Sequence, residues 1–326
     1  MSRSLRILVL VFLAGSSLLR AGDNGAVSRI AFGSCNRHDL PQPLWEPISA
    51  FRPQIWIWLG DNIYGDTEDM AVLEEKWKLQ KSQPSYAAFR AFGAVIEGVW
   101  DDHDYGVNDG GRDYPAKTAS QKLFLDFLDV PTGDPRRSHE GIYSTRTFGP
   151  PEREVRLILL DVRTHRDKPR TGGDILGTAQ WEWLEGVLAN SRSVVHLIAS
   201  GSQILPSEHR FEKWADYPAS RERLLGLLES HRIANVFMIS GDRHHAEISQ
   251  LATDSLFLTE VTSSGMTHSL EKNTGEPNAL RIGRVFGGLN FGTLELDWES
   301  AAATASIRDR SGRPVEQVTV PLRISD

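Results

Sequence analysis

Six short apolar runs recur along this chain and constrain its fold more than any other feature. They cover residues 29–32, 54–59, 94–100, 155–160, 194–198 and 233–239. Near-continuous runs of this length, rich in Ile and Val, are typical of strands that are buried on both faces. Helical patterns lie between them, at residues 44–51, 68–81, 119–128, 180–189 and 221–230. This alternation predicts an α/β core.

The C-terminal part of the chain has a different pattern. From about residue 247 onward, helical periodicity gives way to short strands with turn signals, as in residues 256–259, 292–298 and 317–322. We expect this tail to be mainly β and to add a second sheet, so that residues 27–326 form a single domain. The Gly- and Asp-containing segments 105–115 and 167–177 are expected to be loops.

The N-terminus has the pattern of a targeting segment. Arg3 and Arg6 precede an apolar run over residues 7–13. A basic start followed by a short apolar core is typical of a secretory signal peptide, which we expect over residues 1–22. The alternative is an ordinary first helix. We therefore expect a secreted or periplasmic protein. No later apolar run reaches the roughly 18 residues of a membrane span, so none is expected in the mature form.

Charge and cysteine content exclude some classes of protein. The net charge is -7, whereas a general nucleic-acid binder needs a basic surface to neutralise phosphates. Cys35 is the only cysteine, so an exported form would have no intramolecular disulfide. A single thiol in an oxidising compartment has to be buried or bound to something, which makes Cys35 a residue of interest.

Polar side chains follow the ends of the predicted strands. In an open α/β sheet the carboxyl ends of the strands line one crevice, where ligands bind. Residues far apart in the sequence would then meet in one pocket. The candidates at these strand ends are Cys35, Asp61, Tyr64, Asp101, Asp102, His103, Asp104, Asp161, Asp242, His244 and His245. We treat most of the other histidines, His268 among them, as surface or core groups.

The composition of this predicted pocket points to metal ions. So many carboxylates cannot remain ionised in a small cavity without compensating positive charge. Carboxylate oxygens suit hard ions, while thiolate, imidazole and phenolate groups suit a transition metal. Two ions of different character are therefore expected. A pair of ions bridged by one carboxylate can clamp a phosphate ester and activate a hydroxide.

Each motif also has a simpler interpretation, and two other classes of protein compete. Gly60-Asp61 alone could be an ordinary turn, and Asp101 to Asp104 could be a solvated turn or helix cap.

A cysteine hydrolase using Cys35 is one alternative, although we expect the acidic pocket to raise the pKa of its thiol. A non-catalytic secreted metal-binding protein is the other, but no EF-hand pattern is present. The joint occurrence of the motifs favours the enzyme with two metals.

A family resemblance is carried by the segments GSCN, GDNIYGDT, WDDHDYG, LDVRTHR, SGSQ and SGDRHH, in this order. Together they resemble the alkaline phosphatase D family of metallophosphoesterases, over roughly residue 30 to the end. The resemblance implies a two-sheet α/β/β/α sandwich of the metallo-dependent phosphatase type. It also implies metal-dependent hydrolysis of small phosphate mono- or diesters, by in-line attack of a metal-activated hydroxide.

The resemblance further implies roles for individual residues. Asp61 would be the carboxylate that bridges two ions, expected to be ferric iron and calcium. The other ligands of the iron would be Cys35, Tyr64 and His244. The other ligands of the calcium would be Asp102 and Asp242. The position of Gln203 often carries a histidine ligand in the broader superfamily, so its direct ligation is doubtful.

Two further residues complete the predicted catalytic set. The resemblance implies that His103 lies beside the leaving oxygen as general acid or transition-state stabiliser. Arg163, which follows the end of the run at residues 155–160, is our candidate for holding a phosphate oxygen through its planar guanidinium. The alternative role for Arg163 is a structural ion pair with Asp161 or a neighbour.

Overall fold

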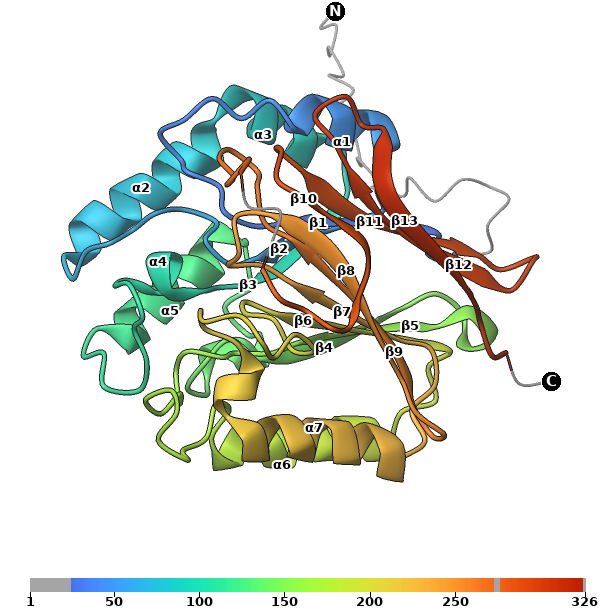
Figure 1. The fold of residues 1–326 in the computed structure, drawn as a ribbon. Coiled ribbons are helices and arrows are strands. Elements are labelled where there is room, and N and C mark those ends of the chain that lie inside the picture. Colours follow the sequence, from blue (N-terminus) through green and yellow to red (C-terminus); the bar gives the residue numbers. More distant parts are fainter. Residues whose placement is uncertain (1–24, 273–275, 325–326) are drawn as a thin grey trace, which may run out of the picture.

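Two β-sheets pack face to face between two groups of helices (Figure 1). The structure, a computed structural model, describes residues 25–272 and 276–324. The signal peptide expected over residues 1–22 lies outside the described residues. The predicted two-sheet α/β/β/α sandwich is confirmed.

The first sheet combines three early strands with three strands from the C-terminal part. From edge to edge these are β13 (Pro314–Pro321), β12 (Ala302–Arg308), β11 (Phe291–Asp297), β1 (Arg29–Gly33), β2 (Ile55–Leu59) and β3 (Val95–Val99). The second sheet contains β10 (Arg281–Phe286), β8 (Ala246–Ala252), β9 (Phe257–Ser263), β7 (Val236–Ser240), β6 (Val195–Ser200), β5 (Val155–Leu159) and β4 (Ser144–Phe148).

The helices cover the outer faces of the two sheets (Figure 1). Those on the side of the first sheet are α1 (Trp45–Phe51), α2 (Met70–Ser82), α3 (Pro84–Ala91) and α5 (Lys117–Phe127). Those on the side of the second sheet are α6 (Thr178–Ala189) and α7 (Pro218–Ser230). A single helical turn, α4 (Asp102–Tyr105), directly follows β3.

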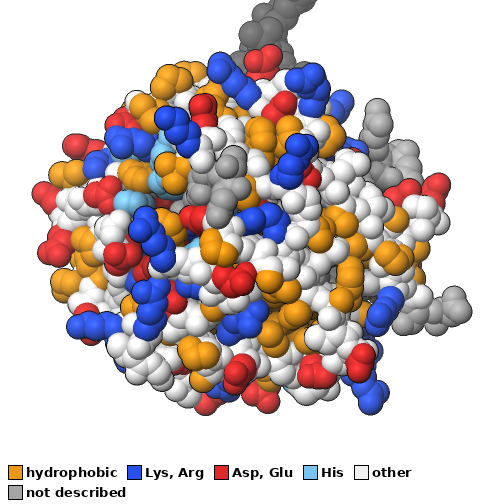
Figure 2. Space-filling view, viewed as in Figure 1, with side chains coloured by type: hydrophobic (Ala, Val, Ile, Leu, Met, Phe, Trp, Pro, Cys, Tyr) orange, Lys and Arg blue, Asp and Glu red, His pale blue; other side chains and the backbone are white. Residues whose placement is uncertain are grey.

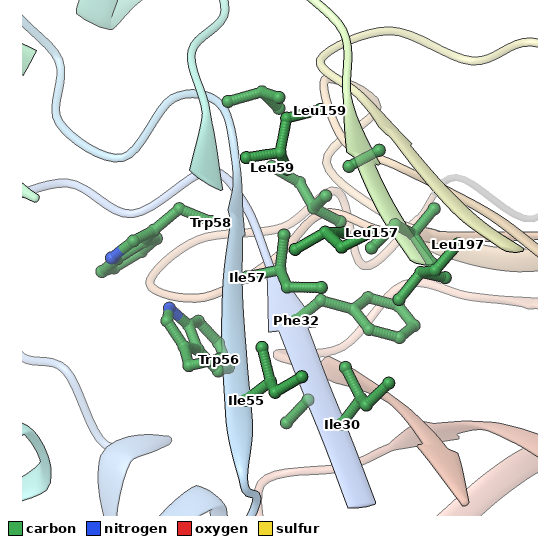
Figure 3. Packing of buried hydrophobic residues seen from close by; sticks show 14 of the residues in the cluster. Ile30, Phe32, Ile55, Trp56, Ile57, Trp58, Leu59, Leu157, Leu159 and Leu197 are labelled. Carbon is green, nitrogen blue, oxygen red and sulfur yellow. The ribbon is translucent and has the colours of Figure 1, made fainter. Parts of the chain in front are cut away.

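Strand β2 shows why the early strands are apolar on both faces. Trp56 and Trp58 point to the helical side, where their rings lie 5.0 and 5.3 Å from that of Trp45 in α1. The alternate residue Ile57 points to the other sheet and packs in one cluster with Leu157 of β5 (Figure 3). Both faces of the strand are therefore buried, and polar residues are excluded until the strand ends.

The parallel strands bring their carboxyl ends to one edge. Strands β1, β2 and β3 pair in parallel, and so do β5, β6 and β7. A single parallel bridge between Ser34 and Ser264, which follow β1 and β9, connects the two sheets at this edge. The predicted convergence of strand ends is thus confirmed for both sheets.

Some expectations about the fold are wrong. The tail does not make a second sheet of its own: β8, β9 and β10 extend the sheet begun by β5–β7, and β11–β13 extend the first sheet. The segment 105–115 is not entirely a loop, because Tyr105 ends α4. Helix α3 was missed, although Pro84 at its first turn is a common start signal. Within the described residues, none of the helices is long and apolar enough to cross a membrane.

Two leucines in α2 provide a matched test of this packing. Leu73 is completely buried, whereas the side chain of Leu79 is 46% exposed. We expect Leu73→Ala to lower the free energy of unfolding by about 2–5 kcal/mol, because it leaves a cavity. We expect Leu79→Ala to change it by less than about 0.5 kcal/mol. Urea unfolding of both variants measures this, and equal effects would contradict the assigned faces of the helix.

Candidate metal centre

Four of the candidate residues at the strand ends have an unusual backbone conformation. Cys35, Asp61, Asp242 and His244 have φ angles of 57°, 50°, 70° and 54°. Non-glycine residues are uncommon in this left-handed region, and such strained positions concentrate at functional sites. Gly60 precedes Asp61 with a φ of 90°, and a Cβ there would clash with Asp101. A glycine is therefore required for the ends of β2 and β3 to approach each other.

One half of the centre contains a thiol, a carboxylate, a phenol and an imidazole. The Sγ of Cys35 lies 3.4 Å from the Oδ2 of Asp61. The hydroxyl of Tyr64 lies 3.5 Å from the same oxygen and 3.1 Å from the Nε2 of His244. Cys35, Asp61 and His244 each offer a ligand atom within 4.8 Å of the others. The structure thus brings these four predicted ligands together.

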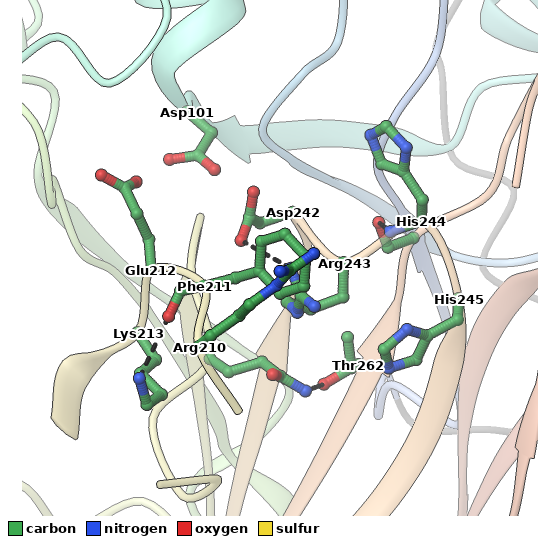
Figure 4. Close-up of polar contacts among 12 residues, drawn as sticks. Asp101, Arg210, Phe211, Glu212, Lys213, Asp242, Arg243, His244, His245 and Thr262 are labelled. Atoms are coloured by element: carbon green, nitrogen blue, oxygen red, sulfur yellow. Dashed lines mark hydrogen bonds and ion pairs between the residues drawn. The ribbon is translucent and has the colours of Figure 1, made fainter. Parts of the chain in front are cut away.

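The other half of the centre is made of carboxylates around the same Asp61. Asp61 forms one group with Asp102 and His103, and another with Asp101 and Asp242, with ligand atoms within 4.8 Å of one another in each. Figure 4 shows the carboxylates of Asp101 and Asp242 near each other, with His244 alongside. Asp61 is the member shared by both halves.

Unsatisfied oxygens show that these residues fit a cation. Among the described residues, Asp61 Oδ1, Asp101 Oδ2 and Asp242 Oδ2 are buried and have no hydrogen-bond donor. Buried acceptors without a donor are rare and costly. Three such oxygens close together are suitable ligand atoms for a hard metal ion.

The electrostatics of the centre agree with this fit. Burial raises the pKa of Asp61 well above its ordinary value, and the charges of Cys35 and Asp102 add to the effect. Burial and the charge of Asp102 also raise the pKa of Asp242 to about 7, against the opposing effect of Arg243. Without cations these two carboxylates resist ionisation, whereas bound cations would favour their charged forms.

The thiol of Cys35 differs from our expectation. Burial raises its pKa, but the charge and hydrogen bond of His244 outweigh burial and lower it to about 6. In return, Cys35 raises the pKa of His244 to about 9. The expectation that acidic surroundings raise the pKa of this thiol is therefore wrong, because the imidazole of His244 faces it. A thiolate is also the form that binds a metal.

His103 lies at the side of the centre, held by two neighbours. Its Nδ1 is 2.5 Å from Asp66 Oδ1, and its ring lies 4.2 Å from the ring of Tyr64. Burial lowers the pKa of His103, but the hydrogen bond to Asp66 and the charge of Asp102 outweigh this and raise it. Because Asp66 occupies Nδ1, Nε2 is the nitrogen left for a substrate.

Arg163 is fully buried and its guanidinium is already engaged. Its Nε donates to Asp101 Oδ1 at 2.6 Å, and its Nη2 donates to Glu212 at 2.8 Å. These contacts use donors that a phosphate would need. Contact with phosphate remains a prediction, while the alternative, an ion pair with a neighbour, agrees better with this arrangement. The neighbour is Asp101 rather than Asp161.

Several other candidates support the centre without pointing into it. Asp104 accepts hydrogen bonds from the backbone N–H groups of Asp61 and Asn62, so it holds the loop after β2. Asp161 accepts from the Ile142 N–H and from Thr164. The ring of His245 points away from that of His244 (Figure 4).

Gln203, whose ligation was doubtful, lies in a polar network of the second sheet. Its side-chain nitrogen donates to Glu247 at 2.7 Å and to Thr262 at 2.8 Å. These contacts orient its amide nitrogen into that network.

His268 is the residue that sequence reasoning missed. Its Nε2 lies 3.0 Å from the Tyr64 hydroxyl, and its ring is 4.6 Å from that of His244. Tyr64 and His268 are 204 positions apart, and His268 does not directly follow an apolar run. No local signal marks it, because the bridge between Ser34 and Ser264 brings it here.

The comparisons with known proteins show the family and the fold of this chain. The sequence model of the PhoD-like phosphatases matches residues 30–282. Alkaline phosphatase D of Bacillus subtilis (strain 168) is 26% identical over an alignment of 207 residues that covers 52% of this chain and 34% of that protein. The match thus spans about a third of the length of that relative.

Solved structures resemble the whole fold. A structure of PhoD matches this fold with a TM-score of 0.67 at 18% sequence identity. The match covers 92% of this chain and 69% of the PhoD chain. A structure of GAP50, the anchor in the inner membrane complex of Plasmodium, matches with a TM-score of 0.58 at 13% identity. That match covers 91% of this chain and 90% of the GAP50 chain. These identities show likeness of fold alone. The resemblance first indicated by the six motifs is confirmed by the match over residues 30–282, and the chain belongs to the PhoD-like phosphatase family.

Proposed function

We propose that this chain is a metal-dependent phosphoesterase that hydrolyses small phosphate mono- or diesters at a two-metal centre bridged by Asp61. The position of Asp61 is the observation that carries the proposal. Its Oδ2 faces the thiol of Cys35 and the phenol of Tyr64, while its Oδ1 is buried and has no hydrogen-bond donor. The residue also groups with Asp101 and Asp242. A carboxylate with two such different sides suits a bridge between two dissimilar ions.

The ligand types support the expected ions. Cys35, Tyr64 and His244 would hold ferric iron, because thiolate, phenolate and imidazole groups favour a transition metal. Asp102 and Asp242 would hold calcium through hard carboxylate oxygens. When bound, the two ions supply charge that polarises a phosphoryl oxygen and lowers the pKa of a coordinated water.

The chain itself supplies a proton donor and a rigid frame. We propose that His103, fixed through Nδ1 by Asp66, donates a proton from Nε2 to the leaving oxygen. Arg163 fixes Asp101 and Glu212 at the edge of the centre. A centre held in this way binds its substrate without first reorganising.

A direct test is to assay purified protein against a panel of phosphate monoesters and diesters. We expect hydrolysis of at least one of the two classes, which also reveals the preference between them. No turnover with any ester, in protein that contains its metals, would overturn the proposal.

The cysteine hydrolase remains a second candidate because His244 lowers the pKa of Cys35. Cys35→Ser distinguishes the two. As a metal ligand, Cys35 is needed for iron, so we expect iron affinity to fall by at least about tenfold and activity with it. A cysteine hydrolase would instead lose activity while keeping all its metal. Elemental analysis and an ester assay on the same sample decide between these outcomes, with Ser264→Ala as a control beside the thiol.

We also propose that the protein is exported to the periplasm or medium, on the basis of the expected signal peptide at residues 1–22. N-terminal sequencing of the mature protein is expected to begin near the end of that segment. An intact N-terminus on protein found in the cytoplasm would contradict this.

A further inference from the structure

A cavity near the metal centre has no part in the mechanism above. Its volume is about 530 Å³, and it is lined by residues 208–211 together with Leu270, Glu276 and Pro277. We call it the side pocket. Pockets of this size accommodate an organic group much larger than a methyl.

Two contacts attach the side pocket to the metal centre. The Leu270 N–H donates to the carbonyl oxygen of His244 at 2.7 Å. Arg243, which follows Asp242, donates to both carboxylate oxygens of Glu276 at 2.6 Å (Figure 4 shows Arg243 beside Asp242). These contacts place the lining of the side pocket next to two predicted metal ligands, His244 and Asp242.

His209 gives the side pocket its polar character. The residue is only 5% exposed, yet neither ring nitrogen has a hydrogen-bond partner among the described residues. Burial and the charge of Arg243 lower the pKa of His209 to about 4, so the ring is neutral and presents one donor and one acceptor. Leaving both unsatisfied is costly. Two hydroxyl groups, one that donates to the bare nitrogen and one that accepts from the N–H, would satisfy such a ring.

The walls of the side pocket are apolar and its charges balance. Phe211 and Leu270 are 39% and 48% exposed, which is high for large hydrophobic side chains. The guanidinium groups of Arg243 and Arg210 lie 4.1 and 4.9 Å from the centre of the Phe211 ring. Arg243, behind the lining, forms an ion pair with Glu276, and Arg210 and Glu208 both line the pocket. The lining therefore favours an uncharged ligand with apolar faces.

The surrounding surface is mixed in charge. On the face drawn in Figure 2, acidic and basic side chains of the described residues are interspersed, with histidines reaching the surface between them. Selectivity for one class of ligand therefore depends on the residues that line the pocket rather than on a broad positive or negative electrostatic potential around it.

We propose that the side pocket binds an uncharged, hydroxyl-bearing ring, of glycosyl or nucleoside size, as the organic group of the phosphate ester held at the metal centre. A sugar ring combines hydroxyls for His209 with apolar C–H faces for Phe211 and Leu270. This inference rests on the proposed phosphoesterase function and adds its substrate class.

The test compares esters that differ only in their organic group: methyl, glucosyl and thymidine 5′-yl. Each is supplied as a monoester, assayed by phosphate release, and as a p-nitrophenyl diester, assayed by p-nitrophenolate release. We expect kcat/KM to be at least about tenfold higher for the ring-bearing esters, as two buried hydrogen bonds imply. A higher kcat/KM for either ring-bearing ester than for the methyl ester supports the proposal. The comparison of the glucosyl with the thymidine 5′-yl ester shows whether the pocket prefers a sugar or a nucleoside.

Variants connect that preference to His209. His209→Leu should reduce the ratio of ring to methyl kcat/KM by about tenfold, while His209→Gln, which keeps a donor and an acceptor, should retain most of it. His209→Leu should not lower the melting temperature, because it removes unsatisfied polar atoms. His139→Leu, outside the side pocket, is the matched control.

The possible failures are distinct. No hydrolysis of any ester by the wild type overturns the phosphoesterase function. Hydrolysis with equal kcat/KM for methyl and ring esters overturns the side-pocket proposal alone. So does a preference that His209→Leu leaves unchanged.

Discussion

Asp61→Asn is expected to abolish hydrolysis and metal retention together. The substitution keeps the size of the side chain but removes the charge that both ions share, so we expect turnover to fall by at least about a thousandfold. Metal content should fall in the same sample. Ester assays and elemental analysis of the purified variant measure both quantities.

The same variant should remain folded. Burial and neighbouring negative charges raise the pKa of Asp61 above its value in the unfolded chain, so the metal-free protein loses stability as the pH rises toward neutral. The neutral amide avoids this repulsion, and the melting temperature of the metal-free variant should equal or exceed that of the metal-free wild type. Asp254→Asn, at an exposed position, is the control. An active Asp61→Asn protein would exclude Asp61 as the bridge.

His103→Gln is expected to have the second largest effect, of a different kind. If His103 supplies a proton to the leaving oxygen, turnover should fall by about 10²–10³, while metal content stays the same. The loss should be greater for alkyl esters than for p-nitrophenyl esters, because p-nitrophenolate leaves without much protonation. Steady-state kinetics on both substrates, with elemental analysis, measures this difference.

Asp66→Asn tests how much of the effect of His103 depends on the orientation of its ring and how much on proton donation by the ring. Asp66 contacts only Nδ1 of the ring, so we expect this variant to lose much less turnover than His103→Gln. A His103→Gln variant that loses metal as well would instead make His103 a ligand. A variant that hydrolyses both substrates like the wild type would remove it from the mechanism.

Sequence patterns were sufficient for the central part of the fold. Strands such as β2 are buried on both faces, so their apolar runs are visible without knowing the partners. The polar residues that follow them then mark the carboxyl edge, and this located Cys35, Asp61 and Asp242. The assignment of tail strands to sheets could not be predicted in this way, because it depends on pairings between distant segments such as β1 with β11.

The remaining features of the centre depend on contacts across the fold. His268 and Glu212 do not follow apolar runs, and they reach the centre only through tertiary packing onto Tyr64 and Arg163. The low pKa of Cys35 depends on the orientation of His244, and the sequence does not show that this imidazole faces the thiol. Composition alone therefore indicated the wrong direction for this shift.

We propose that two metal ions and the residues around Asp61 form one catalytic unit. The most direct measurement is metal content by elemental analysis, made together with ester hydrolysis, before and after chelation and again after ions are restored. We expect two ions per chain, loss of hydrolysis when they are removed, and recovery when iron and calcium are returned. Undiminished hydrolysis by the metal-free chain would contradict it.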